Sequence, residues 1–178
     1  MSNERIYIVG YMGSGKSSGG KRLAEMLGWP FEDTDHVLEK QSGKDISGLF
    51  EAVGEPEFRR MEGAVLRQLS EGPDRLVVAT GGGTPCFGDH MSFMLSRGTV
   101  VYFKMAPEPI TVRLRSRRAG RPLLEGVSEE GLLEYVRTHL SGREAHYDRA
   151  HITVDADALD EQRMKSVVRM IEARGINL

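Results

Sequence analysis

The sequence predicts an α/β fold with an open parallel β-sheet of about five strands and helices on both faces. Short, nearly continuous apolar runs alternate with longer segments of helical spacing, which is typical of a parallel sheet covered on both sides. The first apolar run leads straight into a glycine-rich segment and then into a helical pattern. No repeat, low-complexity tract or linker divides the 178 residues, so we expect a single domain over residues 1–178.

The first predicted elements enclose the glycine-rich segment. Residues 6–9, Ile-Tyr-Ile-Val, form a buried strand, and residues 17–27 form a helix. A Gly-Trp-Pro sequence ends that helix, and a short extended segment from Phe31 reaches Asp33 and Asp35. The side chains expected to face the core from the helix are Leu23, Met26 and Leu27.

Three further apolar runs predict the remaining strands. They cover residues 76–79, 100–103 and 151–154, and each is rich in β-branched or aromatic side chains. Helical spacing is found over residues 110–115 and again over residues 160–173. The residues of the closing helix expected to be buried are Met164, Val167, Val168 and Ile171.

Composition excludes several classes of protein. The net charge is −2, so no global positive field favours nucleic acid or an anionic membrane as a partner. Cys86 is the only cysteine, so an intrachain disulfide is impossible and a reducing compartment fits best. No apolar stretch has the length of a membrane span. We therefore expect a cytoplasmic protein that is a monomer, because a chain of this length can build its own core.

Residues 10–17, GYMGSGKS, match the phosphate-loop pattern G-x-x-x-x-G-K-[ST] between a predicted strand and a predicted helix. Glycines let backbone N–H groups turn toward phosphate oxygens, Lys16 can reach the β- and γ-phosphates, and the Ser17 hydroxyl can bind Mg²⁺. The pattern predicts a P-loop NTPase-type fold that binds ATP and Mg²⁺. A chance match in a glycine-rich turn is the alternative, which the flanking elements disfavour. The predicted nucleotide-binding residues of the loop are Gly13, Ser14, Gly15, Lys16, Ser17 and Ser18.

Asp33-Thr34-Asp35 is the first candidate for catalysis. Alternate residues of an extended segment point the same way, so Asp33 and Asp35 can share one site. Asp33 would then act on the Mg²⁺ side, and Asp35 would accept the proton of a substrate hydroxyl. The alternatives are a pair of exposed turn carboxylates or a helix cap before residues 36–40.

A run of three glycines and a cluster of arginines add further candidates. Gly81-Gly82-Gly83 follows the strand at residues 76–79, where it lets a ligand approach the backbone and offers N–H groups, although a plain turn is the alternative. The polar stretch over residues 116–126 is expected to close over ligands, as part of a lid at about residues 114–126. The clustered arginines are Arg113, Arg115, Arg117, Arg118 and Arg121.

In order and spacing, these motifs resemble those of the shikimate kinase family. The phosphate loop alone is shared by many unrelated proteins, but its combination with the other motifs is far more specific. The resemblance covers about residues 6–154. The motifs that carry it, besides the phosphate loop, are Asp33-Thr34-Asp35, Phe58-Arg59, Gly81-Gly82-Gly83, Arg121-Pro122-Leu123-Leu124, and Arg143 followed by Tyr147.

The resemblance implies transfer of the γ-phosphate of ATP to the 3-hydroxyl of shikimate, a step in making aromatic amino acids. Asp35 would bind the ring hydroxyls and help to activate one, within a substrate-binding segment at about residues 33–62. Arg59 and Arg143 would grip the substrate carboxylate beside the backbone of Gly81, Gly82 and Gly83, as guanidinium forks suit a carboxylate. Lys16 and Arg121 would act on the transferring phosphate. Arg113, or else Arg115, would stack on adenine.

Two competing functions remain open. A gluconate or nucleoside monophosphate kinase could share the fold, although a nucleobase acceptor calls for stacking and amide contacts rather than two arginines. A nucleotide-binding module without turnover is a further alternative. It is disfavoured because Lys16, Ser17, Asp33, Asp35 and Arg121 are all present.

Two local features need a structural explanation. Gly19 and Gly20 lie in the first turns of the first helix, where each costs about 1 kcal/mol relative to Ala. Cys86 follows the triple glycine closely, and we expect it to be an inert thiol rather than a reactive one.

Overall fold

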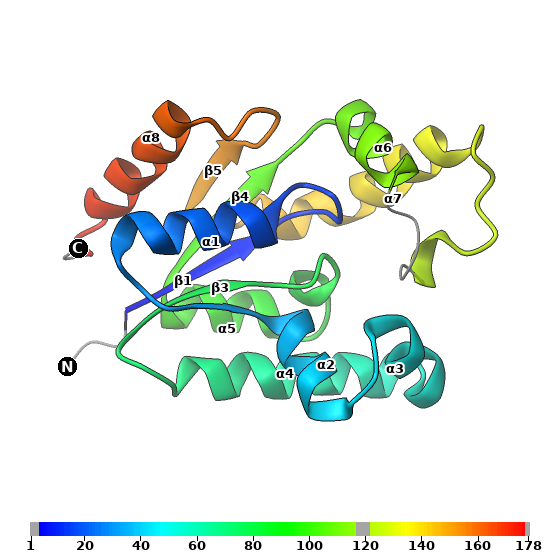
Figure 1. The fold of residues 1–178 in the computed structure, drawn as a ribbon, viewed down its shortest axis with the longest axis horizontal. Helices are drawn as coiled ribbons and strands as arrows, with labels where there is room; N and C mark the ends of the chain where they lie inside the picture. Colours follow the sequence, from blue (N-terminus) through cyan, green and yellow to red (C-terminus); the bar gives the residue numbers. More distant parts are fainter. Residues whose placement is uncertain (1–3, 117–121, 177–178) are drawn as a thin grey trace.

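The computed structural model describes residues 4–116 and 122–176. One parallel sheet of five strands runs through the molecule in the order β2-β3-β1-β4-β5 (Figure 1). This arrangement confirms the predicted fold class. The strands are β1 (Glu4–Val9), β2 (Phe31–Asp33), β3 (Arg75–Ala79), β4 (Thr99–Lys104) and β5 (Ile152–Asp155).

Helices connect the strands and cover the sheet. The helices are α1 (Lys16–Leu27), α2 (Thr34–Ser42), α3 (Ile46–Val53), α4 (Glu55–Ser70), α5 (His90–Arg97), α6 (Pro107–Arg115), α7 (Leu132–Tyr147) and α8 (Glu161–Glu172), with short 3₁₀ turns η1 (Thr84–Cys86) and η2 (Pro122–Leu124). The predicted first and last helices are confirmed to within a residue at each end. Helices α2 to α5 and α7 were not predicted individually.

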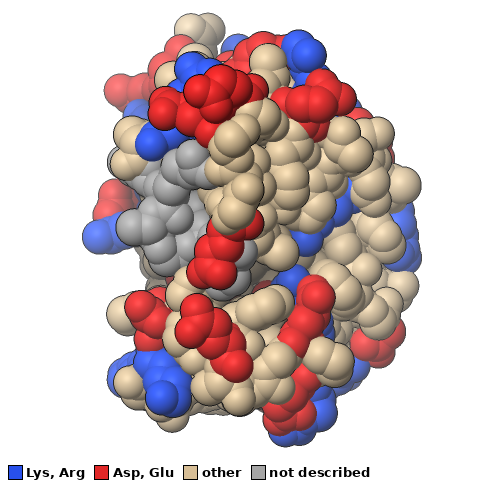
Figure 2. Space-filling view, turned by 90° about the vertical axis from the view of Figure 1, so that its right-hand side faces the viewer, with Lys and Arg blue, Asp and Glu red and all other residues tan. Residues whose placement is uncertain are grey.

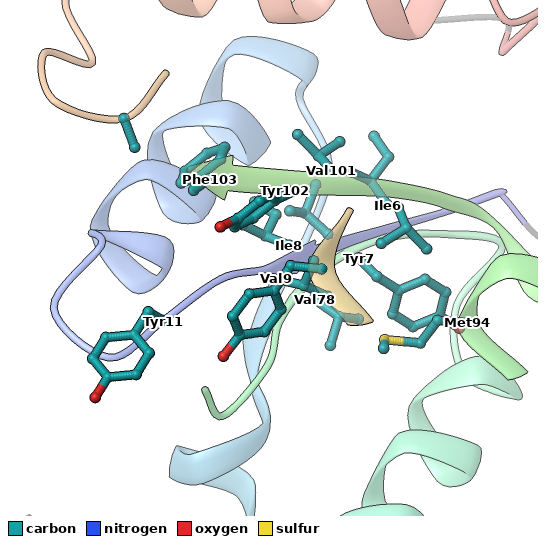
Figure 3. Packing of buried hydrophobic residues seen from close by; sticks show 14 of the residues in the cluster. Ile6, Tyr7, Ile8, Val9, Tyr11, Val78, Met94, Val101, Tyr102 and Phe103 are labelled. Atoms are coloured by element: carbon teal, nitrogen blue, oxygen red, sulfur yellow. The ribbon is translucent and has the colours of Figure 1, made fainter. Parts of the chain in front are cut away.

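Strand β1 lies at the centre of the sheet and is buried on both faces. Ile6, Tyr7, Ile8 and Val9 have no exposed surface, which explains why the strand is a continuous apolar run. On one face Ile8 lies under α1, and on the other Tyr7 lies beside Met94 of α5 (Figure 3). Each such fully buried side chain contributes about 1.5–3 kcal/mol to the hydrophobic free energy of folding.

Helix α1 approaches the sheet closely because it carries glycine where it faces the strands. A Cβ atom at Gly19 would lie 2.5 Å from the Phe103 ring of β4, and one at Gly20 would lie 2.9 Å from the Phe31 ring of β2. The glycines that weaken the helix on propensity are therefore required by its packing. Leu23 is fully buried, whereas Met26 is 38% exposed, so the prediction that Met26 faces the core was wrong.

In helix α8, a capping side chain fixes where the helix begins. Asp160 is its N-cap, and the Asp160 side chain accepts a hydrogen bond from the backbone N–H of Arg163. Met164, Val167 and Ile171 are fully buried, as their spacing predicts.

The carboxyl ends of the strands meet at one edge of the sheet, on the right-hand side of Figure 1. The phosphate loop follows β1, the first turn of α2 with Asp35 follows β2, and the triple glycine follows β3. In the view of that edge in Figure 2, basic side chains lie in a hollow near the centre of the face, and most acidic ones lie around it. Open parallel sheets bind ligands in this place. Within the described ranges, no helix is long and apolar enough to cross a membrane.

Candidate active site

A large open cavity of about 570 Å³ lies over the phosphate loop, within the size range typical of ligand sites. Arg113 of α6 reaches across the loop, and its Nη1 atom donates a hydrogen bond to the carbonyl oxygen of Gly13 at 3.2 Å. The predicted residues that line this cavity are Gly13, Gly15, Lys16, Ser17, Ser18, Asp33, Asp35, Gly82 and Arg113.

The phosphate loop has the backbone geometry that its glycines allow. Gly15 has φ +86°, in the left-handed region that other residues avoid, and it directly precedes the first turn of α1. Lys16 is 8% exposed, and its Nζ atom donates to the carbonyl oxygen of Tyr11 at 2.9 Å. Ser14, within the same loop, is fully buried, does not line the cavity, and donates its N–H to the Tyr11 carbonyl.

The Asp33–Asp35 pair is built differently from the prediction. Strand β2 ends at Asp33, which is the N-cap of α2 and accepts a hydrogen bond from the N–H of Asp35 at 3.0 Å. The extended alternation was therefore wrong, and the helix-cap alternative describes the local structure. Both carboxylates nevertheless line the large cavity, because the first turn of α2 turns Asp35 toward it.

Ser17 and Asp33 come together as the metal prediction requires. The Ser17 hydroxyl donates to Asp33 Oδ2 at 2.5 Å, so two oxygen groups of the kind that Mg²⁺ prefers are adjacent. Within residues 4–116 and 122–176, no group of three or more His, Cys, Asp or Glu side chains could hold a metal ion by itself. The donor set fits Mg²⁺, which commonly takes one or two protein ligands together with phosphate oxygens and water.

Asp35 has the most perturbed carboxyl group of the site. The pKa of Asp35 is raised to about 7, chiefly by burial and also by the neighbouring negative charges of Asp33 and Glu62, against the opposing effect of Lys16. Asp35 lines both the large cavity and a second, smaller cavity. A carboxylate with a pKa near neutrality can accept a proton at physiological pH.

The smaller cavity, of about 120 Å³, lies beside the triple glycine, and we refer to it as the acceptor cavity. It meets the large cavity at Met12, Asp35 and Gly82, which line both. One wall is apolar and includes the rings of Phe50 and Phe58, which pack edge to face at 5.2 Å. The predicted residues that line it are Asp35, Arg59, Gly81, Gly82 and Gly83.

Arg59 is held firmly at the acceptor cavity. Its Nη1 atom pairs with Glu62 Oε2 at 2.7 Å and its Nη2 atom with Glu55 Oε1 at 3.2 Å. The guanidinium carbon also lies 4.1 Å from the centre of the Phe87 ring. These contacts fix the position of the Arg59 guanidinium group at the acceptor cavity before any ligand arrives.

Glu62 and Thr84 are site residues that the sequence prediction missed. Glu62 is 1% exposed and lines the acceptor cavity, with the Thr84 hydroxyl donating to Glu62 Oε1 at 2.6 Å. The helical spacing of Arg59 and Glu62, three residues apart, was the available signal. Nothing local in the sequence indicates the contact with Thr84, which is 22 residues further along.

Arg143 is not in the acceptor cavity, although it lies close by. It is 8% exposed on α7 and lines a third cavity, which shares Leu123 with the acceptor cavity. Glu55 and Phe87, which both contact Arg59, also line this third cavity. The two predicted carboxylate-binding arginines therefore line two neighbouring cavities that share Leu123.

The triple glycine is fixed by hydrogen bonds on both sides. The N–H of Gly81 donates to the Thr34 hydroxyl at 3.1 Å, and the carbonyl of Gly82 accepts from the Tyr147 hydroxyl at 2.6 Å. The expectation that Gly81 offers its N–H to a ligand was therefore wrong, since Thr34 occupies that group. The segment is a positioned wall rather than a plain flexible turn.

Arg113 and Arg115, the two candidates for contact with adenine, lie in different surroundings. Arg113 lines the large cavity, whereas Arg115 is exposed and does not line it. Helix α6 continues through Arg115, so the first residues of the predicted lid are helical. Arg121, predicted to act in catalysis and nucleotide binding, lies outside the described residues, as do Arg117 and Arg118.

Cys86 lies at the end of η1 and is half-buried. Burial is the main effect on its thiol, and it raises the pKa of Cys86 above its ordinary value despite the nearby Arg143. A thiol that stays protonated at neutral pH is a weak nucleophile, in agreement with the expected inert role.

Comparisons with known proteins agree with this geometry. Residues 12–172 match the family model described as shikimate kinase. The shikimate kinase of Parabacteroides distasonis is 40% identical over 156 residues, which cover 88% of this chain and 90% of that protein. The crystal structure of shikimate kinase from Acinetobacter baumannii in complex with shikimate has a TM-score of 0.86 and 34% identity, covering 98% and 96% of the two chains.

A more distant structure shares only the fold. A gluconokinase from Sinorhizobium meliloti superimposes with a TM-score of 0.59 at 16% identity, over 98% of this chain and 97% of that one. Since the phosphate-loop fold is common to kinases of different acceptors, this likeness carries no conclusion about the acceptor.

Proposed function

The chain belongs to the shikimate kinase family, and from that membership we propose that it transfers the γ-phosphate of ATP to the 3-hydroxyl of shikimate. The products are shikimate 3-phosphate and ADP, in a step toward chorismate and the aromatic amino acids. The observation that carries the proposal is the junction of the two cavities at Asp35, where an acceptor hydroxyl and a phosphate would meet.

The phosphate loop is proposed to hold ATP in the large cavity. Backbone N–H groups of the loop and the N-terminus of α1 suit phosphate oxygens, and Lys16 is near enough to exchange its Tyr11 contact for a phosphate. Arg113 flanks the same cavity and is proposed to stack on adenine. Phosphoryl transfer depends on this kind of positioning and charge neutralisation more than on covalent help.

Mg²⁺ is proposed to bind at Ser17 and, directly or through water, at Asp33, which are hydrogen-bonded to each other. When bound, the ion would neutralise charge on the β- and γ-phosphates. Asp33 has a second task in the fold, because its other carboxylate oxygen caps α2 and thereby orients Asp35.

Asp35 is proposed as the base of the reaction. The acceptor oxygen forms a bond to the γ-phosphorus as the bond to the β,γ-bridging oxygen breaks, and ADP leaves with that electron pair. The hydroxyl proton passes to the Asp35 carboxylate, whose pKa of about 7 suits proton transfer near neutral pH. Arg121, in the lid, is proposed to reach the transferring phosphate.

Arg59 and Arg143 are proposed to bind the substrate carboxylate together, from the two neighbouring cavities that they line. Both guanidinium groups are largely buried, so a carboxylate between them would be poorly screened by water. The apolar wall at Phe50 and Phe58 would pack against the ring of the acceptor. Closure of the lid would exclude water, which otherwise competes as the phosphate acceptor.

We also propose that the chain forms one domain, is a monomer and is located in the cytoplasm. A single kinase domain and a monomer are supported by the continuous hydrophobic core, which includes residues of β1, β3, β4 and β5 and has Phe31 of β2 packed against it. A cytoplasmic location is supported by the dependence on ATP and by the free thiol of Cys86.

The proposal is tested by ADP release from the purified protein with ATP, Mg²⁺ and shikimate, with gluconate and CMP as parallel acceptors. We expect release that depends on shikimate alone. Turnover with gluconate or CMP instead would keep the kinase fold and overturn the acceptor, and ATP binding without transfer to any of the three would favour a non-catalytic module.

A further inference from the structure

Helix α7 carries four polar side chains at four-residue spacing, which we call the α7 stripe: Tyr135, His139, Arg143 and Tyr147. Residues four apart lie on one face of a helix, so the stripe is a single surface. Its third member, Arg143, is proposed above to bind the acceptor. Its neighbours in the stripe, His139 and Tyr147, make hydrogen bonds to the loops that line the large cavity and the acceptor cavity.

The first of these bonds joins the stripe to the phosphate loop. The Tyr11 hydroxyl and His139 Nδ1 are 2.7 Å apart, and the two rings pack edge to face with centres 5.5 Å apart. Tyr11 is 1% exposed, and Figure 3 shows it on the loop beyond β1, apart from the side chains packed on the strands. The same residue accepts hydrogen bonds at its carbonyl oxygen from Lys16 Nζ and from the N–H of Ser14.

The second bond joins the stripe to the triple glycine. The Tyr147 hydroxyl donates to the carbonyl of Gly82 at 2.6 Å, and Gly82 lines both cavities. Arg143 lies one helical turn from His139 and one from Tyr147. The part of α7 that carries Arg143 is thus hydrogen-bonded on one side of Arg143 to the phosphate loop and on the other side to the triple glycine.

The chemistry of His139 suits a fixed acceptor of a hydrogen bond. Burial, together with the positive charges of Arg143 and Arg59, lowers the pKa of His139 to about 4, so the ring is neutral at physiological pH. A neutral imidazole has one nitrogen that accepts, and Nδ1 accepts from the Tyr11 hydroxyl in the tautomer that carries its proton on Nε2.

We propose that the Tyr11–His139 hydrogen bond is a positioning contact that couples nucleotide binding at the phosphate loop to the orientation of Arg143 at the acceptor. The inference rests on the proposed function, because it assumes that ATP and shikimate occupy the two cavities. Neither side chain is placed at the reacting atoms. Their effect is on how well the second substrate binds once the first is present.

The coupling has a direct physical route. A nucleotide phosphate that draws Lys16 away from the Tyr11 carbonyl changes what holds Tyr11 in place. The rigid Tyr11 ring transmits that change to His139, one turn from Arg143 on the same helix. Such coupling between two bound ligands is reciprocal, so shikimate would strengthen nucleotide binding by the same factor.

The test is calorimetric titration of shikimate into the full-length protein, with and without saturating MgADP. For the parent protein we expect shikimate to bind at least about fivefold more tightly with MgADP present. In Tyr11→Phe and in His139→Leu this ratio should fall below about twofold. The double variant should match the single ones, because both remove one shared contact.

Two further variants separate positioning from general packing. His139→Gln keeps an acceptor for the Tyr11 hydroxyl, and it should restore most of the coupling. Tyr102→Phe removes a buried hydroxyl that has no hydrogen-bond partner among the described residues, so it should keep the parent ratio. If His139→Leu fails to fold, Tyr11→Phe decides, since it removes a single oxygen atom.

The outcomes distinguish this inference from the proposed function. A parent protein that does not bind shikimate at all would overturn the function itself. A parent protein that binds shikimate equally with and without MgADP would overturn only the coupling. Variants at Tyr11 and His139 that keep the parent ratio would do the same.

Discussion

Asp35 shows how one side chain can be predicted for the right site with the wrong local structure. In the sequence, Asp35 comes just after a predicted strand. The carboxyl ends of parallel strands form the ligand-binding edge of the sheet, so this position alone predicts that Asp35 belongs to the site. The orientation comes instead from the cap that Asp33 forms on α2. A cap and an extended alternation look alike over three residues, so the sequence alone does not separate them.

The raised pKa of Asp35 has a consequence for stability. An unfolded aspartate has a pKa of about 3.9, whereas that of Asp35 in the folded protein is about 7. Between these values the folded chain binds more protons than the unfolded chain, so stability falls as pH rises through that window. Replacement by Asn removes this dependence.

We therefore expect Asp35→Asn, without metal or nucleotide, to be more stable than the parent at pH 8 by about 1–2 kcal/mol. That figure is below the ~4 kcal/mol of the full displacement, because water in the open cavity screens the charge. At pH 4 the two proteins should be equally stable. Urea unfolding at both pH values measures this, with Asp157→Asn at an exposed carboxylate as the control. Equal stability at pH 8 would contradict the raised pKa.

Glu62 is expected to control shikimate binding through Arg59. Glu62→Gln keeps the acceptor for Thr84 but sets an amide donor against the Arg59 guanidinium, which disturbs a buried ion pair. The KM for shikimate should rise about tenfold, which corresponds to about 1.4 kcal/mol of binding free energy. The KM for ATP should change less than about twofold, since Glu62 does not line the large cavity over the phosphate loop.

The same helix offers a matched control for that variant. Glu57 pairs with Arg60 at the same three-residue spacing, but both side chains are exposed. Exposed pairs contribute little, so Glu57→Gln should leave both KM values unchanged. An equal effect of the two substitutions would point to a general change in α4 rather than to Arg59.

At the scale of elements, burial decides what could be predicted. The central strands are continuous apolar runs because both of their faces are covered, and their pattern is unmistakable. Helix α8 carries its own cap and a clear buried stripe. Helices α2, α3 and α4 follow each other with short turns at Gly43 and Gly54, so their separate patterns merge in the sequence.

In helix α1, close packing at a glycine and the higher helix propensity of alanine have opposite effects on stability. Gly19→Ala should destabilise the protein by about 1–2 kcal/mol, because overpacking against Phe103 and Leu159 outweighs the gain of about 1 kcal/mol in helix propensity. Gly142→Ala, in α7, meets no atom within 4 Å and should stabilise it by about 0.5–1 kcal/mol. Chemical denaturation of both variants checks the opposite signs, and a stabilised Gly19→Ala would contradict the close approach of α1 to the sheet.

At the scale of the molecule, the site depends on contacts between distant parts of the chain. The sheet order puts β1 between β3 and β4, which brings the phosphate loop next to the triple glycine. The motif resemblance predicted which residues belong to the site. It could not predict that Arg143 lines a cavity separate from that of Arg59, or that Thr34 occupies the Gly81 N–H, because these are facts of packing across elements.

The measurement that tests the central claim most directly is NMR of the product after incubation with ATP, Mg²⁺ and shikimate. Phosphorus and proton spectra identify the carbon whose oxygen carries the new phosphate. We predict stoichiometric ADP and a single product with the phosphate on the 3-oxygen. Phosphate on another ring oxygen, or ADP with inorganic phosphate and unchanged shikimate, would contradict the account.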